Sequence, residues 1–220
     1  AVLGNFVGVD AAGLKPLGNA GNGIQLVDAP KNTVGGPQPG DRNVISANQG
    51  EGVRLDGALS AGNRVQGNHI GLSVSGFTDV GNAASGIYIR RAPANVVEQN
   101  VVAGNDGFAG IAVCGTQTFC GGGDAGTPGS NAGGNVIRQN SVGLDVGLRL
   151  ALGNRGYGVS VDGAPNTAIG GVGQGNSIRA NGNAGVVLFA GATGTVVSSN
   201  TISRNLIGVF VDGEATVGNT

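Results

Sequence analysis

The sequence predicts an all-β fold: a right-handed, single-stranded parallel β-helix, or solenoid, of about seven coils with loop insertions. Three observations lead to this prediction. Short apolar stretches recur behind glycines, and asparagines recur at one phase of the same repeat. The composition, in turn, supports a core of small aliphatic side chains.

The composition describes a folded chain with an aliphatic interior. Glycine accounts for 46 of the 220 residues, 40% of the residues are hydrophobic and only 4% are aromatic. With 11% charged residues and a net charge of −1, the chain lacks the repulsion that keeps disordered chains expanded. The near-neutral balance of positive and negative charges gives no sign of nucleic-acid binding. No signal peptide is visible, and no apolar run approaches the roughly 18 residues of a membrane span.

Seven stretches read Gly-Val/Ile-x-apolar, and their apolar residues alternate as in half-buried strands. In GVRLDG, Val53 and Leu55 would face inward, whereas Arg54 and Asp56 would face outward. Units this short cannot bury an apolar face alone, so they must stack as parallel strands about 4.8 Å apart. The stretches begin at Gly23, Gly52, Gly86, Gly110, Gly158, Gly185 and Gly208.

A second series, Val/Ile-x-x-Asn, interleaves with the first. Asparagine carries a donor and an acceptor and tolerates left-handed backbone geometry, so asparagines stacked at one corner can bond one another and the turn backbone. Generic loop asparagines would not recur at one phase. The predicted asparagine ladder consists of Asn5, Asn48, Asn68, Asn100, Asn140, Asn181 and Asn200.

A longer pattern recurs on every second coil, at residues 7–23, 70–86 and 142–158. Each copy begins with Val/Ile-Gly and carries apolar-Gly-Asn at the same later position, so the larger unit is two coils, one plain and one with a loop. We interpret residues 1–220 as one β-helix domain, either a window of a longer chain or a stacking unit. The two-coil super-repeats lie near 5–67, 68–139 and 140–200.

The segments VGVDAAGLKPLGNAGNG and NTVGGPQPGDRNVISANQGEGV carry a family resemblance. They resemble the right-handed parallel β-helix repeats of the pectin-lyase-like superfamily, and more closely the IGxDxxG…LGNxGxG and NxIGG…NVISGN repeats of large bacterial secreted or cell-surface proteins. The resemblance covers the whole chain and implies the fold. It also implies two enzyme classes to test: lyases with an Arg or Lys base beside Asp-bound calcium, and hydrolases with clustered Asp pairs.

Either chemistry needs charged groups that converge on one outer strand face. Counting two and four residues beyond each strand glycine brings Arg54, Asp56, Tyr88 and Arg90 together on neighbouring coils. Asp56 and Arg90 are interpreted as a cross-strand ion pair, and no Asp pair, calcium shell or His–carboxylate pair accompanies them. We predict no catalytic residues and keep these four as a candidate glycan-contact face, with solvated strand surface as the leading interpretation.

Other reactive side chains are expected to play structural roles. His69 has no carboxylate neighbour in the sequence and is expected to face outward without binding a ligand. Asp10 and Asp145 occupy matching loop positions, where the middle copy has Ser73, and are expected to cap turns rather than bind calcium. No metal site and no cofactor are expected.

Cys114 and Cys120 could close a short loop as a disulfide, which would fit an oxidising location, although Cys114 lies at an outward strand position and could remain free. The favoured function is a non-catalytic structural or interaction module, a rigid extracellular or cell-surface stalk, spacer or filament unit. The alternative is a β-helix that binds or degrades acidic polysaccharides as a lyase or hydrolase. Expected partners are end-to-end copies or flanking β-helix coils, and polysaccharide under the alternative, but neither nucleic acid nor an inserted membrane.

Overall fold

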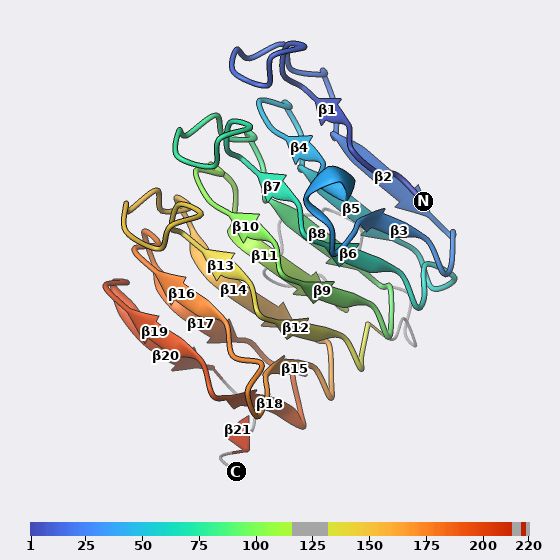
Figure 1. Ribbon diagram of the computed structural model, residues 1–220. Coiled ribbons are helices and arrows are strands. Elements are labelled where there is room, and N and C mark those ends of the chain that lie inside the picture. Colours follow the sequence, from blue (N-terminus) through green and yellow to red (C-terminus); the bar gives the residue numbers. More distant parts are fainter. Residues whose placement is uncertain (116–131, 213–216, 219–220) are drawn as a thin grey trace.

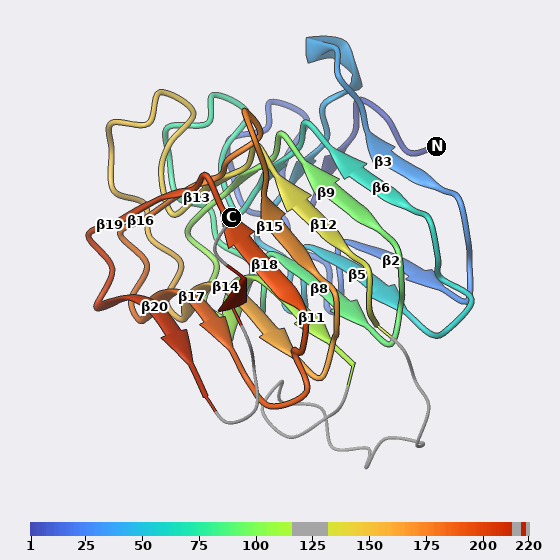
Figure 2. The ribbon, with the colours of Figure 1, turned by 90° about the horizontal axis from the view of Figure 1, so that it is seen from below.

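A computed structural model describes residues 1–115, 132–212 and 217–218 of the chain. The chain winds through three parallel sheets of seven strands each, and successive strands of the chain enter successive sheets (Figure 1). Figure 2 shows the coils stacked behind one another, with the sheets forming the sides of a tube. The predicted all-β parallel β-helix of about seven coils is confirmed. No helix of the described part has the length and apolar character needed to cross a membrane.

The strands are short, as the alternating stretches of the sequence predict. Sheet 1 consists of β1 (Phe6–Val7), β4 (Val44–Ile45), β7 (His69–Ile70), β10 (Val101–Val102), β13 (Ser141–Val142), β16 (Ser177–Arg179) and β19 (Thr201–Ser203). Sheet 2 consists of β2 (Ile24–Val27), β5 (Val53–Asp56), β8 (Ile87–Arg90), β11 (Ala109–Cys114), β14 (Tyr157–Asp162), β17 (Ala184–Leu188) and β20 (Ile207–Val211). Sheet 3 consists of β3 (Thr33–Gly35), β6 (Arg64–Gln66), β9 (Val96–Glu98), β12 (Val136–Arg138), β15 (Ala168–Gly170), β18 (Thr195–Ser198) and β21 (Val217–Gly218). A 3-10 turn, η1 (Pro39–Asp41), lies between β3 and β4.

The seven glycine-led stretches of the sequence form sheet 2 in a single register. Val53 pairs with Ile87 and Leu55 pairs with Ile89 on neighbouring strands. These four side chains are fully buried, because alternate residues of each strand point into the tube. Each fully buried aliphatic side chain contributes about 1.5–3 kcal/mol. The core is therefore one continuous aliphatic column in which each coil packs on the next.

Two ladders in which asparagine side chains bond one another run along the tube, one on each side of sheet 1. The first lies between sheets 3 and 1, and its side-chain amides donate from coil to coil through Asn5, Asn43, Asn68, Asn100, Asn140, Asn176 and Asn200. The second lies between sheets 1 and 2 and runs through Asn19, Asn48, Asn82, Asn105, Asn154, Asn181 and Asn205. At the third corner, between sheets 2 and 3, asparagine oxygens accept from backbone N–H groups of the preceding coil.

The prediction of one ladder is therefore wrong for two of its members. Asn48 and Asn181 belong to the second ladder, and Asn43 and Asn176 take their places in the first. The physical reason is that both corners need the same side chain. At either corner the chain leaves a strand and turns, and the asparagine amide donates to strand carbonyls through its nitrogen while its oxygen accepts from the neighbouring coil.

Loops leave sheet 1 on alternate coils, between β1 and β2, between β7 and β8, and between β13 and β14 (Figure 1). The Val/Ile-Gly that opens each loop has a steric cause. Gly71 has φ of +84°, and a Cβ placed there would lie 2.0 Å from the carbonyl oxygen of Ala103. Gly81 precedes ladder residue Asn82 at the end of the loop, and a Cβ there would lie 1.9 Å from the carbonyl oxygen of Gly104. Glycine is thus required where the loop leaves the coil and where it rejoins the coil.

Candidate functional site on the outer face of sheet 2

Two pairs of facing residues on neighbouring strands build the candidate site. Arg54 pairs with Tyr88, and Asp56 pairs with Arg90, across the β5–β8 ladder. Because alternate residues of a strand share one face, all four side chains lie on the outer face of sheet 2. The structure thus brings together the four residues that the sequence groups as a candidate glycan-contact face.

Asp56 is the centre of an arginine network. Its carboxylate lies 2.9 Å from a guanidinium nitrogen of Arg54, 3.5 Å from one of Arg90 and 3.6 Å from one of Arg91. The cross-strand ion pair between Asp56 and Arg90 is confirmed. Glu51 adds a second carboxylate 3.5 Å from Arg54. Three arginines and two carboxylates give these five residues a formal charge of +1, which would attract an anionic ligand.

Arg54 and Tyr88 form a stacked pair. The guanidinium carbon of Arg54 lies 5.3 Å from the centroid of the Tyr88 ring, within the range of a cation–π contact. Burial alone would lower the pKa of Arg54, but the hydrogen bond to Asp56 and the charges of Glu51 and Asp56 outweigh it and raise that pKa. Burial raises the pKa of Tyr88, although the positive charges of Arg54 and Arg90 oppose the rise. The arginine stays charged and the phenol stays neutral.

The face is buried, which corrects the interpretation of it as solvated strand surface. Tyr88 and Arg90 are 6% and 9% exposed, and Ala112, Ser160 and Val187 further along the same row are fully buried. Charged and polar residues on a single outer strand face ordinarily remain in water. Here most of the row is buried, and the Arg54, Glu51 and Arg91 side chains, 20%, 18% and 28% exposed, retain the greatest access to solvent.

An aromatic cluster covers the middle of this face. The ring centroids of Phe108 and Tyr157 lie 5.1 Å apart, and Phe189 lies 6.2 Å from Phe108 and 6.0 Å from Tyr157. Phe189 lies four residues beyond the strand glycine Gly185, where the counting from these glycines predicts an outward side chain, but the counting misses Phe108 and Tyr157, which precede the strand glycines. The glycine interrupts the alternation: a Cβ at Gly110 would point inward, 2.9 Å from Val142. The signal that could have found them is an aromatic residue two positions before the strand glycine in GFAG and one position before it in GYG.

Sheet 3 carries a second charged group that the sequence analysis did not single out. Glu98, buried on β9, forms ion pairs with Arg64 of β6 and with Arg138 of β12, the latter at 2.8 Å. Arg138 also donates to the side-chain oxygen of Gln174 at 2.8 Å. A carboxylate held between two arginines is satisfied by them, and this group is best explained as a clamp between three coils.

The other predicted positions behave as turn caps or as buried groups. Asp10 accepts from the backbone N–H groups of Leu14 and Lys15 at 2.8 and 3.1 Å, and these bonds lower its pKa. Burial would raise the pKa of Asp145, but three backbone N–H donors outweigh it and lower that pKa. The expected capping role of both aspartates is confirmed. No group of three or more His, Cys, Asp or Glu side chains that could hold a metal occurs among the described residues.

His69 and the cysteines complete the predicted set. His69 lies on the outer phase of β7, as expected, but it is only 1% exposed because the loop of residues 71–81 passes over it. A Cβ at Gly76 of that loop would lie 2.8 Å from the imidazole. The predicted pairing of Cys114 with Cys120 depends on Cys120, which lies outside the described residues.

The comparisons with known proteins agree with this architecture. Residues 17–220 match the family model described as right-handed beta helix region. The chain belongs to this family. The predicted family resemblance and the right-handed coil are thereby confirmed. Curated proteins provide no match to the chain.

Two solved structures resemble this right-handed β-helix distantly. One is a mutant of the periplasmic alginate epimerase AlgG, at 16% identity and a TM-score of 0.45 over 89% of this chain. The other is the Dettilon tailspike protein, at 19% identity and a TM-score of 0.38 over 93% of this chain. The match covers 47% and 45% of those chains, so this chain spans about half their length. Likeness at this level concerns the β-helix alone.

Proposed function

We propose that this chain is a non-catalytic structural segment, a rigid β-helical stalk, spacer or filament unit of an extracellular or cell-surface protein. The observation that carries the proposal is the unbroken bonding between coils. Along the first ladder, side-chain amides link each coil to the next from Asn5 to Asn200, and the second ladder does the same from Asn19 to Asn205. Three continuous sheets accompany the ladders.

This bonding resists deformation along the tube axis. Separating two coils must break backbone bonds in three sheets and one rung in each ladder, and it must expose aliphatic core to water. Each hydrogen bond is worth only about 0.5–1.5 kcal/mol net, but those of one interface must break together. The extracellular placement is supported by the resemblance of the repeats to those of secreted and cell-surface proteins.

Pulling a single molecule from its two ends tests the mechanical part of the proposal. We expect discrete unfolding steps, each the release of whole coils, and a lower unfolding force in Asn100→Leu than in the unchanged chain. The exposed Lys31, which lies outside the ladders, offers a control, and Lys31→Glu should leave the force unchanged. Gradual extension without steps would contradict a rigid spacer.

Incubation with uronate polymers tests the non-catalytic part. Alginate and pectate should yield no ultraviolet-absorbing unsaturated products, no new reducing ends and no change at C5 by nuclear magnetic resonance. Turnover that disappears in Asp56→Asn would overturn the proposal and identify the arginine network as a catalytic site. Turnover that survives this change would place the chemistry elsewhere on the chain.

The second candidate function is binding of an acidic glycan without turnover. It is supported by the charged guanidinium of Arg54, which lies over the Tyr88 ring and is partly exposed, beside Arg91. Retention on an immobilised acidic polysaccharide should then be weakened in Arg54→Gln, while Arg204→Gln, at an exposed arginine on another part of the coil, should retain it. Equal weakening by both changes would indicate only non-specific attraction to positive charge.

A further inference from the structure

Three loops form one continuous ridge along the side of sheet 1. They comprise residues 8–18, 71–81 and 143–153, and their outer surface is called the loop face below. The backbone N–H of Val74 donates to the carbonyl oxygen of Gly13 at 2.9 Å, and that of Val146 donates to the carbonyl oxygen of Gly76 at 3.2 Å. Each loop is also closed by its own antiparallel bridge. The loops therefore stack directly, although they leave alternate coils.

This ordered ridge presents large apolar side chains to water. The exposed fraction of these side chains ranges from 38% for Val146 to 67% for Leu17, with Leu14, Phe77, Leu148 and Leu150 between these values. Backbone hydrogen bonds hold the loops, so these side chains cannot turn into the core. Exposed apolar side chains gathered on an ordered element mark an interaction surface.

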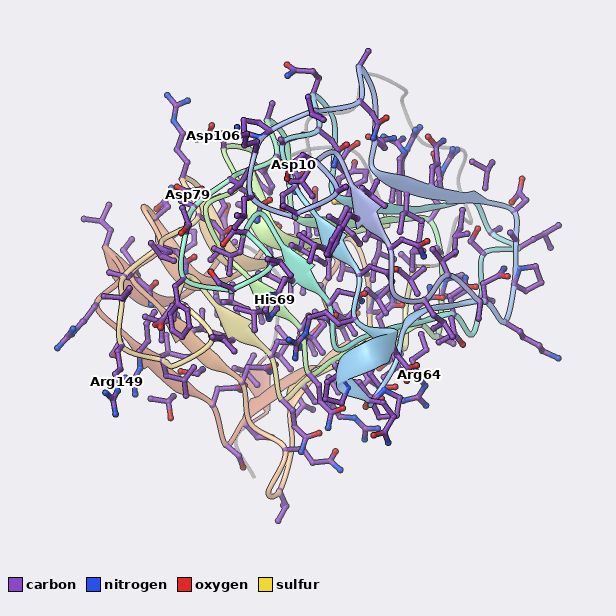
Figure 3. All side chains as sticks on the ribbon, turned by 45° about the horizontal axis from the view of Figure 1, so that its top comes forward. Asp10, Arg64, His69, Asp79, Asp106 and Arg149 are labelled. Carbon is purple, nitrogen blue, oxygen red and sulfur yellow. The ribbon has the colours of Figure 1, made fainter. Side chains whose placement is uncertain are left out.

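The second and third loops of the loop face carry opposite exposed charges, Asp79 and Arg149, while Asp145 of the third loop is buried. Figure 3 shows Asp10, Asp79 and Asp106 on the side of the first two loops and Arg149 on the third. Burial raises the pKa of Asp79, and the negative charge of Asp106 adds to the rise. The first loop carries both an acid, Asp10, and a base, Lys15. Beyond the third loop, Arg155 and Arg204 are also exposed.

We propose that the loop face is the interface of an antiparallel homodimer, in which the second loop of one copy packs against the third loop of the other. A two-fold axis between these loops and perpendicular to the tube makes every contact occur twice. Phe77 of one copy then meets Leu148 and Leu150 of the partner, and Asp79 meets the partner's Arg149. Apolar side chains are covered and opposite charges are paired in the same arrangement.

The charge distribution selects a second copy in this orientation. A parallel dimer would place Arg149 opposite the partner's Arg149 and Asp79 opposite the partner's Asp79, and like charges across an interface are strongly unfavourable. The antiparallel copy places Asp79 of each chain opposite Arg149 of the other. The interface also leaves the sheets and the ladders of each chain untouched.

Sedimentation equilibrium of the full chain over a wide concentration range tests the dimer. We expect a monomer–dimer equilibrium that Phe77→Asp shifts towards monomer by about tenfold or more in Kd. Phe77 is half exposed, so the variant should keep the circular dichroism and thermal midpoint of the unchanged chain. Lys31→Glu, on another corner of the tube, serves as the control and should leave Kd unchanged.

Charge exchange tests the pairing itself. Asp79→Arg and Arg149→Asp should each weaken the homodimer, because each places like charges in both copies of the contact. An equimolar mixture of the two variants should associate again, since each contact between position 79 of one copy and position 149 of the other then joins an arginine to an aspartate. The chain that carries both changes should dimerise as the unchanged chain does.

Three results would overturn the proposal: a monomer at all concentrations, self-association that Phe77→Asp leaves unchanged, or charge variants that do not recover on mixing. Self-association abolished by changes at the exposed Leu206 instead would show that copies meet end to end. None of these results would contradict the proposed spacer role, because that role depends on bonds within one chain.

Discussion

The side-chain amide of Asn68 donates a hydrogen bond of 3.0 Å to the side-chain oxygen of Asn100, which lies 32 residues further along the chain. The same nitrogen donates to the carbonyl oxygens of Val34 at 2.9 Å and of Gln66 at 3.1 Å. Val34 belongs to the preceding coil and Gln66 to the coil of Asn68 itself. One fully buried side chain therefore bonds three successive coils.

Replacing a central rung should cost more stability than replacing an end rung. Asn100→Leu removes donation to Val65, Glu98 and Asn140. It also removes the acceptor of the Asn68 backbone N–H and one of the three acceptors of the Asn68 side-chain amide. We expect a loss of about 1–3 kcal/mol in the free energy of unfolding, because buried polar groups lose their partners. The exposed Asn5 offers the matched control, since water can replace its bonds after Asn5→Leu.

Urea denaturation followed by circular dichroism measures both losses. If Asn5→Leu lowered the free energy of unfolding as much as Asn100→Leu, burial of the central rung would add no stability beyond that of an exposed rung.

The glycine that opens the second loop should tolerate no side chain. Gly71→Ala places a Cβ 2.0 Å from a backbone oxygen at φ of +84°. The left-handed backbone alone costs an L-residue about 1–2 kcal/mol, and a carbonyl in a sheet corner cannot move aside. We therefore expect a total loss of roughly 3 kcal/mol or more, within the range of the largest point-mutant effects.

Gly21→Ala is the control for this change, because no atom lies within 4 Å of a Cβ at Gly21. The midpoint of thermal unfolding should be clearly lower for Gly71→Ala than for Gly21→Ala. Similar midpoints would mean that the loop can leave the coil by another backbone path.

The repeat, the strands and the inward residues could be predicted from the sequence, but the assignment of asparagines to corners could not. Asn43 and Asn48 are five residues apart and flank sheet 1, whereas Asn63 and Asn68 are also five apart and flank sheet 3. A strand of two or three residues and its corner occupy the same length in both sheets. Spacing alone therefore cannot distinguish the two corners, and only the side-chain partners do.

The burial of outward-facing residues also could not be predicted from the sequence. Strand alternation predicts that Tyr88 and His69 face outward, and both do, but it does not say what lies above them. His69 is covered by a loop of its own coil, and the row of Tyr88 is flanked by aromatic side chains that precede the strand glycines. Both effects depend on where inserted residues fold back, which periodicity does not encode.

Removing the central carboxylate of the arginine network should destabilise the fold. Asp56→Asn keeps the shape of the side chain but leaves Arg54, Arg90 and Arg91 without the charge they share. We expect a loss of about 1–3 kcal/mol, below the 3–5 kcal/mol of a fully buried pair because the arginines retain some access to water. Denaturation in urea, which leaves ionic strength unchanged, provides the measurement.

Glu51→Gln provides the control at the rim of this network, since it removes one contact of 3.5 Å to Arg54. Its expected effect is within about 1 kcal/mol, as for exposed ion pairs. A larger loss of stability at Glu51 than at Asp56 would contradict the assignment of Asp56 as the central carboxylate of the network.

Acid should destabilise the chain through its single histidine. Burial, and next the positive charge of Arg42, lower the pKa of His69 from 6.5 to about 4, while the backbone of Ser73 and Val74 opposes the shift. The unfolded chain therefore takes up a proton near pH 6.5 and the folded chain only near pH 4. Above pH 6.5 the imidazole is neutral in both states and contributes nothing to the pH dependence.

Stability should consequently fall as the pH drops from 6.5 to 4, by a total of about 3 kcal/mol at 1.36 kcal/mol per pKa unit. His69→Leu fills a similar volume without titrating, so the difference between the two stability curves isolates the histidine from the carboxylates. Denaturation midpoints at pH 7.5, 5.5 and about 4 measure this difference. Parallel curves would show that the loop over His69 opens to solvent at no cost, and that burial beneath it does not keep the imidazole neutral.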